Sequence, residues 1–181
     1  MRRSEIEQLL PEVFRRALRE DAPLTLLLEA METLHAPSEA ILAQIDRYFD
    51  PYRTPDLFVP FLASWVDMDR IVARTPAQID AATVHALFPS GLGRLRELTA
   101  EAVFLSKWRG TARGMTRFLE VATGLAGFAI DEQVMDEEGR VRPFHLRVHA
   151  PRAAEPYTAL VTRIVDQEKP AYVTYELSFD R

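Results

Sequence analysis

The sequence contains no cysteine in its 181 residues. Disulfide bonds, thiolate metal ligands and thiol nucleophiles are therefore excluded, and a reducing compartment suits such a chain. It also lacks any run of about 20 apolar residues that would span a membrane. The first residues lead into an amphipathic segment and not into the apolar core of a secretion signal. We expect synthesis in the cytoplasm and no membrane contact.

A surplus of basic residues is missing as well. Lysine and arginine number 22 against 27 aspartate and glutamate, which gives a formal net charge of -5. Proteins that bind nucleic acids usually present a basic face to the phosphates. We therefore predict no nucleic-acid partner.

The common catalytic and ligand-binding motifs are absent too. There is no Gly-x-Ser-x-Gly elbow, and the Gly-Leu-Gly sequence at 91–93 lacks both the third glycine of a dinucleotide-binding loop and the lysine of a P-loop. His145 and His149 lie on a predicted strand, where four residues span roughly 13 Å, too far for one metal ion. Asp67 and Asp69 fall in a predicted turn, where carboxylates are usually solvated. The sequence thus predicts no enzymatic activity, no cofactor and no metal site.

What the chain does contain is a long helical part followed by a short α/β part. Apolar residues recur every three or four positions through most of the first two thirds. The main predicted helices cover roughly residues 5–18, 24–49, 55–66, 92–108 and 111–122. Proline is expected to interrupt the first two of them, at Pro11 and Pro37. Thr75 and Pro76 fit the start of a further helix.

After residue 127 the apolar period changes to two. Strands are predicted near residues 128–134, 144–149 and 173–179, with a helix at 156–166 between the last two. We therefore predict an α+β fold. A helical region occupies residues 1–124, and a small β-β-α-β subdomain occupies residues 125–181.

One predicted helix is apolar around much of its circumference. Its apolar positions include Leu24, Leu27, Leu28, Met31 and Leu34. Such a helix is buried either inside its own domain or by a partner protein. We favour a partner, because an assembly protein carries more apolar surface than one small core can hide. These five side chains are our predicted partner-binding residues.

Aromatic residues cluster in the segment that follows. Phe49, Phe58, Phe61 and Trp65 would suit a ligand pocket. Aromatic side chains at helical spacing more often form a contact between helices, with offset or edge-to-face rings. We therefore favour a buried helix–helix core and keep the ligand pocket as the alternative.

A tight corner is predicted where residues 106–115 join two amphipathic segments. Gly110 is able to adopt the positive φ that ends a helix. Thr111 is able to cap the next helix through its hydroxyl. Arg109-Gly110-Thr111 therefore predicts a sharp turn from one helix into the next.

Four stretches, in order along the chain, resemble the phage tail protein I family. They are residues 9–15, 45–66, 107–114 and 168–175. The positions that carry the resemblance most clearly are Phe49, Asp50, Pro60, Trp65, Arg109, Gly110, Thr111, Gly114, Lys169 and Pro170.

The resemblance implies a structural subunit of the baseplate wedge in a contractile tail or a tail-like injection system. It implies pairing with a larger wedge protein, typically two copies of it, through an intertwined bundle of N-terminal helices and a three-part node of C-terminal parts. Further baseplate, hub or sheath proteins would be neighbours, and the subunit would help to transmit the trigger for sheath contraction. No catalysis is implied. Without the resemblance, a small cytosolic ligand-binding or regulatory module is the alternative.

Overall fold

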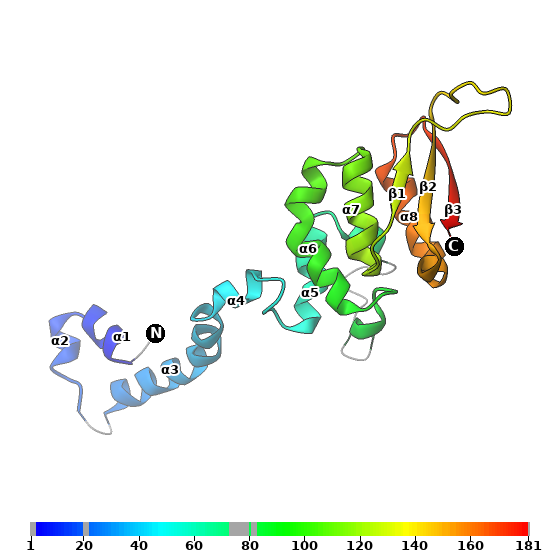
Figure 1. The fold of residues 1–181 in the computed structure, drawn as a ribbon. Coiled ribbons are helices and arrows are strands. Elements are labelled where there is room, and N and C mark those ends of the chain that lie inside the picture. Colours follow the sequence, from blue (N-terminus) through cyan, green and yellow to red (C-terminus); the bar gives the residue numbers. More distant parts are fainter. Residues whose placement is uncertain (1–2, 20–21, 73–79, 81–82, 181) are drawn as a thin grey trace. The chain divides into compact units, whose positions relative to one another are not determined.

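The computed structural model describes residues 3–19, 22–72, 80 and 83–180 (Figure 1). The chain forms two compact units, which divide between Arg47 and Tyr48. The boundary that we predicted, between residues 124 and 125, falls inside the second unit. It does so because the helices before this point share one hydrophobic core with the sheet and the helix after it.

The first unit consists of helices in the part that the structure describes. α1 (Arg3–Leu9) and α2 (Glu12–Arg15) are separated at Pro11, as predicted, because proline has no N–H with which to continue a helix. α3 (Pro23–Leu42) contacts α1 and is followed by α4 (Ile45–Phe49), at whose end the second unit begins.

Pro37 lies inside α3 and does not interrupt it, so our prediction of a break at this position is wrong. A proline removes one backbone hydrogen bond and distorts the preceding turn. α3 has 20 residues, and the turns on both sides of Pro37 keep their own hydrogen bonds.

The second unit begins with a turn that is stabilised by hydrogen bonds, one of them from Arg96, a residue far along the chain. The Tyr52 N–H donates to Asp50 Oδ1 over 2.9 Å, and the Arg96 guanidinium donates to the Thr54 carbonyl over 2.8 Å. η1 (Asp56–Phe58) then leads into α5 (Val59–Trp65). Pro60 is buried in the first turn of α5, where its missing N–H has no role in the helix.

Two antiparallel helices, α6 (Leu92–Lys107) and α7 (Ala112–Thr123), form the centre of the second unit (Figure 1). After the short turns η2 (Asp69–Ile71) and η4 (Val84–Ala86), α6 and α7 pack against each other. The Gly-Leu-Gly sequence forms the start of α6, as a loop that enters a helix. Thr75 and Pro76 lie outside the described residues.

A three-stranded sheet completes the unit, in the order β1-β2-β3. β1 (Ala129–Asp131) is antiparallel to β2 (His145–Pro151), and β2 is parallel to β3 (Thr174–Asp180). η5 (Arg152–Tyr157) and α8 (Thr158–Glu168) connect the parallel pair. This β-β-α-β order confirms the prediction. β1 is shorter than predicted because the connection to β2 leaves the sheet and projects beyond the strands (Figure 1).

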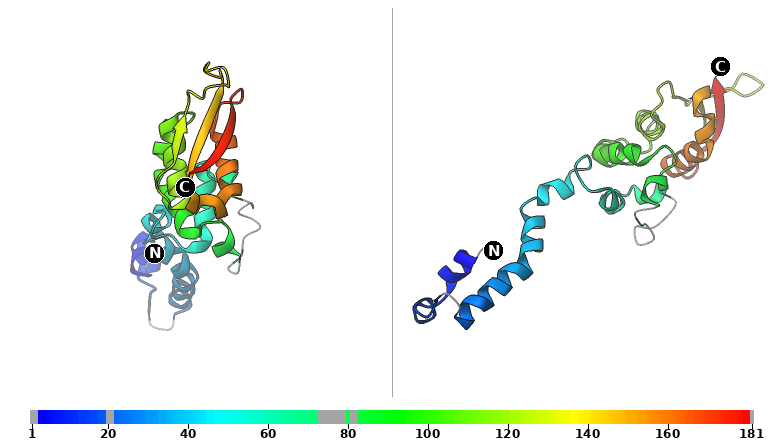
Figure 2. Two further views of the ribbon diagram at one scale, coloured as in Figure 1. Left: turned by 45° about the vertical axis from the view of Figure 1, so that its right-hand side comes forward. Right: turned by 90° about the horizontal axis from the view of Figure 1, so that it is seen from below.

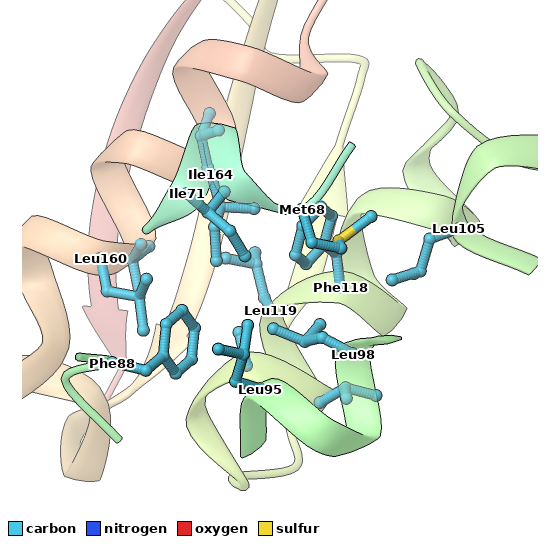
Figure 3. Close-up of a cluster of buried hydrophobic side chains, with 14 of the residues drawn as sticks. Met68, Ile71, Phe88, Leu95, Leu98, Leu105, Phe118, Leu119, Leu160 and Ile164 are labelled. Carbon is cyan, nitrogen blue, oxygen red and sulfur yellow. The ribbon is translucent and has the colours of Figure 1, made fainter. Parts of the chain in front are cut away.

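The core lies where α6, α7, α8 and the inner face of the sheet meet. Figure 3 shows Leu95 and Leu98 from α6, Phe118 and Leu119 from α7, and Leu160 and Ile164 from α8 converging on Met68, Ile71 and Phe88. β2 contributes Leu146, Val148 and Ala150 to the same core. Both views in Figure 2 show α8 beside the sheet. No helix of the described residues has the length and apolar character needed to cross a membrane.

Candidate functional site

The corner between α6 and α7 has the geometry that the sequence predicts. Gly110 has a φ of 75°. Thr111 is the N-cap of α7: its Oγ1 accepts a hydrogen bond from the Gly114 N–H over 3.1 Å and donates one to the Trp108 carbonyl over 2.7 Å. The Thr111 hydroxyl therefore forms hydrogen bonds with a backbone carbonyl at the end of α6 and with a backbone N–H in the first turn of α7.

We expect Gly110→Val to lower the free energy of unfolding by about 1–2 kcal/mol, because a β-branched residue is strained in the left-handed region. An added Cβ meets no atom within 4 Å, so the effect comes from the backbone alone. Gly110→Asn is the matched control. Asparagine tolerates the left-handed region, so this variant should lose less free energy of unfolding than Gly110→Val. Urea denaturation followed by circular dichroism measures both. Wild-type stability of the valine variant would contradict the assigned backbone conformation.

A network of charged side chains ties this corner to two other parts of the second unit. Arg70, in η2, forms an ion pair with Glu168 at the end of α8 and lies 3.2 Å from Asp67 Oδ2. Arg109, at the corner, reaches Asp67 Oδ2 over 3.3 Å and Glu168 Oε1 over 4.0 Å. Glu168 is only 4% exposed, so its charge is compensated inside the protein. Asp67 is an exposed turn residue, as predicted, and its carboxylate also contacts both arginines.

α8 also holds the backbone of η2. The side-chain amide of Gln167 donates to the Arg70 carbonyl over 2.8 Å, and the Arg163 guanidinium donates to the Ile71 carbonyl over 3.1 Å. These two bonds and the Arg70–Glu168 pair fix a short turn that has little secondary structure of its own. Arg70 and Ile71 are thereby bonded directly to α8.

We did not predict this network from the sequence, although a signal for it exists. Glu168 lies three residues after Val165 and four after Ile164, so it continues the apolar face of α8. A carboxylate on an apolar face needs a buried partner of opposite charge. The partner, Arg70, lies 98 positions earlier in the chain (168 − 70), and no periodicity connects the two.

The corner and the end of α8 border one small pocket. Gly110, Thr111 and Pro170 line it together with apolar side chains such as Met115 and Leu146, and its volume is about 170 Å³. Lys169, which precedes Pro170, has the extended conformation expected before proline and ends α8. The predicted motif residues at 109–114 and 169–170 therefore meet in space. At the rim, the rings of Phe144 and Tyr172 are exposed and make an edge-to-face contact at 5.3 Å.

The aromatic cluster is a surface feature, so our prediction of a buried helix–helix core is wrong for most of its members. Trp65 is 61% exposed, and Phe49 and Phe61 are exposed as well. The rings still contact one another: Phe49 and Trp65 lie 5.8 Å apart, and Phe58 packs edge-to-face on Trp65 at 5.9 Å. α5 buries its other side, with Val59, Leu62 and Ala63 in the interior, which leaves the aromatic side to solvent. We call Phe49, Phe58, Phe61 and Trp65 the aromatic surface.

The five predicted partner-binding residues of α3 differ in exposure. Leu27 and Leu34 are exposed, Leu34 by 77%, and Leu24 and Met31 are half-buried. Leu28 is buried, so it serves the packing of the protein itself and offers no surface, contrary to our prediction for this residue. Ile41 and Leu42 extend the exposed apolar side chains towards the end of α3.

The predicted histidine pair lies on the outer face of β2. His145 Nδ1 is 2.8 Å from Thr174 Oγ1 on β3. His149 stands two register positions beyond Arg147, opposite Ala129 of β1 and Ser178 of β3. Among the described residues, no three histidine, aspartate or glutamate side chains are grouped so that they would hold a metal ion.

Comparison with known families assigns the class of the protein. The family described as Phage tail protein (Tail_P2_I) matches residues 22–172, a range that includes α3, the aromatic surface, the corner and the end of α8. The chain belongs to this phage tail protein family, as its sequence suggested. Comparison with curated proteins gave no match.

Proposed function

We propose that the chain is a structural subunit of the baseplate wedge in a contractile tail or in a tail-like injection system. It would hold a larger wedge protein and help to transmit the trigger for sheath contraction, without catalysing a reaction. The family match over residues 22–172 carries the proposal, because it gives the chain a structural role in a tail. The wedge position and the partner are our inference from the surfaces of the two units.

The exposed leucines of α3 support a partner for the first unit. Leu27 and Leu34 lie two helical turns apart on one side of α3, with Leu24 and Met31 between and beside them. Large apolar side chains in such a row are typical of a helix that packs against other helices. A bundle with helices of the larger wedge protein would bury them.

The aromatic surface supports a second contact in the second unit. Tryptophan and other aromatic residues are enriched among the side chains that dominate binding energy in protein interfaces. Next to Trp65, a depression of about 490 Å³ has a mainly apolar lining of Val66, Ala102 and Val103, with Asp67, Ser106 and Lys107 also lining it. This depression enlarges the apolar area around the aromatic surface, as an interface of stable size requires.

Ion pairs between distant segments of the second unit support a part for it in transmitting a mechanical signal. The network around Glu168 joins η2, the α6–α7 corner and α8, and η2 follows α5 directly. A displacement of the aromatic surface would therefore be passed to the helices and the sheet as one body. Switching would occur by repacking of interfaces, which are bistable, and not by deformation of this core.

We expect Leu34→Glu to abolish or strongly reduce copurification of the larger wedge protein, because a charge would have to be buried in the helix bundle. Ala40→Glu is the matched control: Ala40 is also exposed and on α3, but it lies on the opposite side of the helix, at 100° per residue. The measurement is coexpression with the tagged chain, followed by quantification of both proteins. Equal losses in both variants would contradict a partner on the leucine side.

The position in the particle is tested with the tagged full-length chain in its native bacterium. Mass spectrometry of the purified material should identify a larger wedge protein, sheath and tube, and negative-stain images should show rings or tails. Recovery of a clean monomer without partners would contradict the proposal. In that case the 170 Å³ pocket becomes the candidate site of a small-molecule module.

A further inference from the structure

β3 leaves one long edge of the sheet open. It spans seven residues, Thr174–Asp180, and in the part of the chain that the structure describes it pairs only with β2. The register from His145–Thr174 to Pro151–Asp180 runs without a bulge. Figure 1 shows β3 as the outer strand of the sheet, on the side away from β1 and α7.

This edge has few of the features that protect sheet edges from pairing. Proteins commonly use lysine, proline, a bulge or a very short strand for that purpose. The sequence of β3, Thr-Tyr-Glu-Leu-Ser-Phe-Asp, contains no lysine, proline or glycine, and its charged residues are the acidic Glu176 and Asp180. β1, with three residues, is by contrast a short edge.

The ladder shows which backbone groups point outwards. The Thr174 N–H donates to the Phe144 carbonyl on the β2 side over 2.9 Å. Backbone groups of successive residues alternate between the two sides of a parallel strand. The N–H and C=O groups of Tyr175, Leu177 and Phe179 therefore face away from β2.

We propose that a second copy of this chain pairs with this edge, antiparallel and around a two-fold axis at Leu177. In this arrangement Tyr175 of one copy lies opposite Phe179 of the other, and the two Leu177 residues lie opposite each other. Their outward groups would form about six backbone hydrogen bonds between the copies. Their side chains lie on the face that packs on the core, so the apolar layer continues from one copy into the next.

The charge of Glu176 selects this register. Centring the pair on Leu177 places each Glu176 opposite Ser178 of the other copy, at a position without backbone hydrogen bonds where side chains are closest. Moving the centre by one residue to Glu176 keeps the outward groups paired, but it places the two Glu176 carboxylates opposite each other. Arg147 donates a hydrogen bond to Glu176 and lowers the pKa of this carboxyl, which keeps it charged near neutral pH. Centring on Ser178 shortens the overlap of the two strands.

The self-pairing is independent of the baseplate proposal. It describes the isolated chain, through β3, before any C-terminal node of the kind that the resemblance implies has formed, whereas the partner contacts argued above use α3 and the aromatic surface. Failure to recover a wedge partner would leave it untouched. A monomeric chain that still copurifies with a larger wedge protein would refute the self-pairing alone.

The absence of cysteine makes cross-linking a direct test of the register. Full-length Thr174→Cys and Asp180→Cys variants, which keep Glu176, are mixed and oxidised. In the proposed register these two positions lie opposite each other, with Cα atoms about 4.5 Å apart, whereas the same position in the two copies lies about 20 Å apart, beyond the usual range of a disulfide. We expect the mixture to give a disulfide-linked dimer, and each variant alone to give much less. Equal yields in all three samples would overturn the register.

A charge pair of variants tests the interface without cysteine. Ser178→Glu places like charges opposite Glu176 twice in each dimer, and Ser178→Lys places opposite charges there. Sedimentation equilibrium should show a dimer dissociation constant about tenfold or more higher for Ser178→Glu than for Ser178→Lys at low salt, with a smaller difference at high salt. Thermal denaturation controls for folding. Equal dissociation constants, or a wild-type chain that is monomeric at about 100 μM, would overturn the proposal.

Discussion

Replacing Gly114 by alanine is expected to destabilise the second unit by about 3 kcal/mol. A Cβ at this position would lie 2.7 Å from the carbonyl carbon of Trp108, and closer still to its carbonyl oxygen. These are backbone atoms at the end of α6, and the Trp108 carbonyl already accepts the Thr111 hydroxyl over 2.7 Å. The added methyl group is accommodated only if α6 and α7 separate at their corner.

Gly93→Ala is the matched control for this experiment. Gly93 lies in the first turn of α6, and an added Cβ there meets no atom within 4 Å. Alanine should increase stability at this position by up to about 1 kcal/mol, because it favours the helix. Urea denaturation of both variants, followed by circular dichroism, gives the comparison. Similar stabilities for the two alanine variants would show that the helices do not approach closely at Gly114.

Arg70→Met is expected to cost about 3–5 kcal/mol, because it leaves the carboxylate of Glu168 buried without its main partner. Arg109 does not replace Arg70: it is half exposed, and its Nε lies 4.0 Å from Glu168 Oε1. Arg109→Met should therefore cost only up to about 1 kcal/mol, as for an exposed ion pair.

The double variant Arg70→Met, Glu168→Leu separates the charge effect from packing. Apolar residues of similar size often replace a buried ion pair with little loss. We expect the double variant to be more stable than Arg70→Met alone, which gives a coupling energy of about 1 kcal/mol or more between the two positions. Additive losses in the double-mutant cycle would contradict a direct interaction between Arg70 and Glu168.

Gly114→Ala and Arg70→Met also bear on assembly. Both substitutions act on the second unit, and neither Gly114 nor Arg70 belongs to the aromatic surface or to α3. If the second unit transmits movement as a rigid body, a loosened corner or network should leave partner binding intact and impair the later step of contraction. Particles that carry Arg109→Met, which we expect to cost little stability, provide a mild version of this change.

Local features of this protein were determined by its sequence. The two-residue period of the last 50 or so residues predicted the strands, and Gly110 with Thr111 predicted the corner, because a positive φ and a capping hydroxyl are properties of single residues. The break at Pro11 was predictable for the same reason. The continuous course of α3 through Pro37 was not, because the rest of a long helix outweighs one lost hydrogen bond.

Only the tertiary structure decided which apolar and charged side chains are covered. Phe58, Phe61 and Trp65 have helical spacing that suits a core, yet α5 turns its other side inwards, against α6. The pairing of Arg70 with Glu168 and the division between Arg47 and Tyr48 depend on contacts between distant segments. A periodic pattern shows that a face is apolar. What covers that face, another part of the chain or another protein, depends on non-local packing, which a single stretch of sequence does not encode.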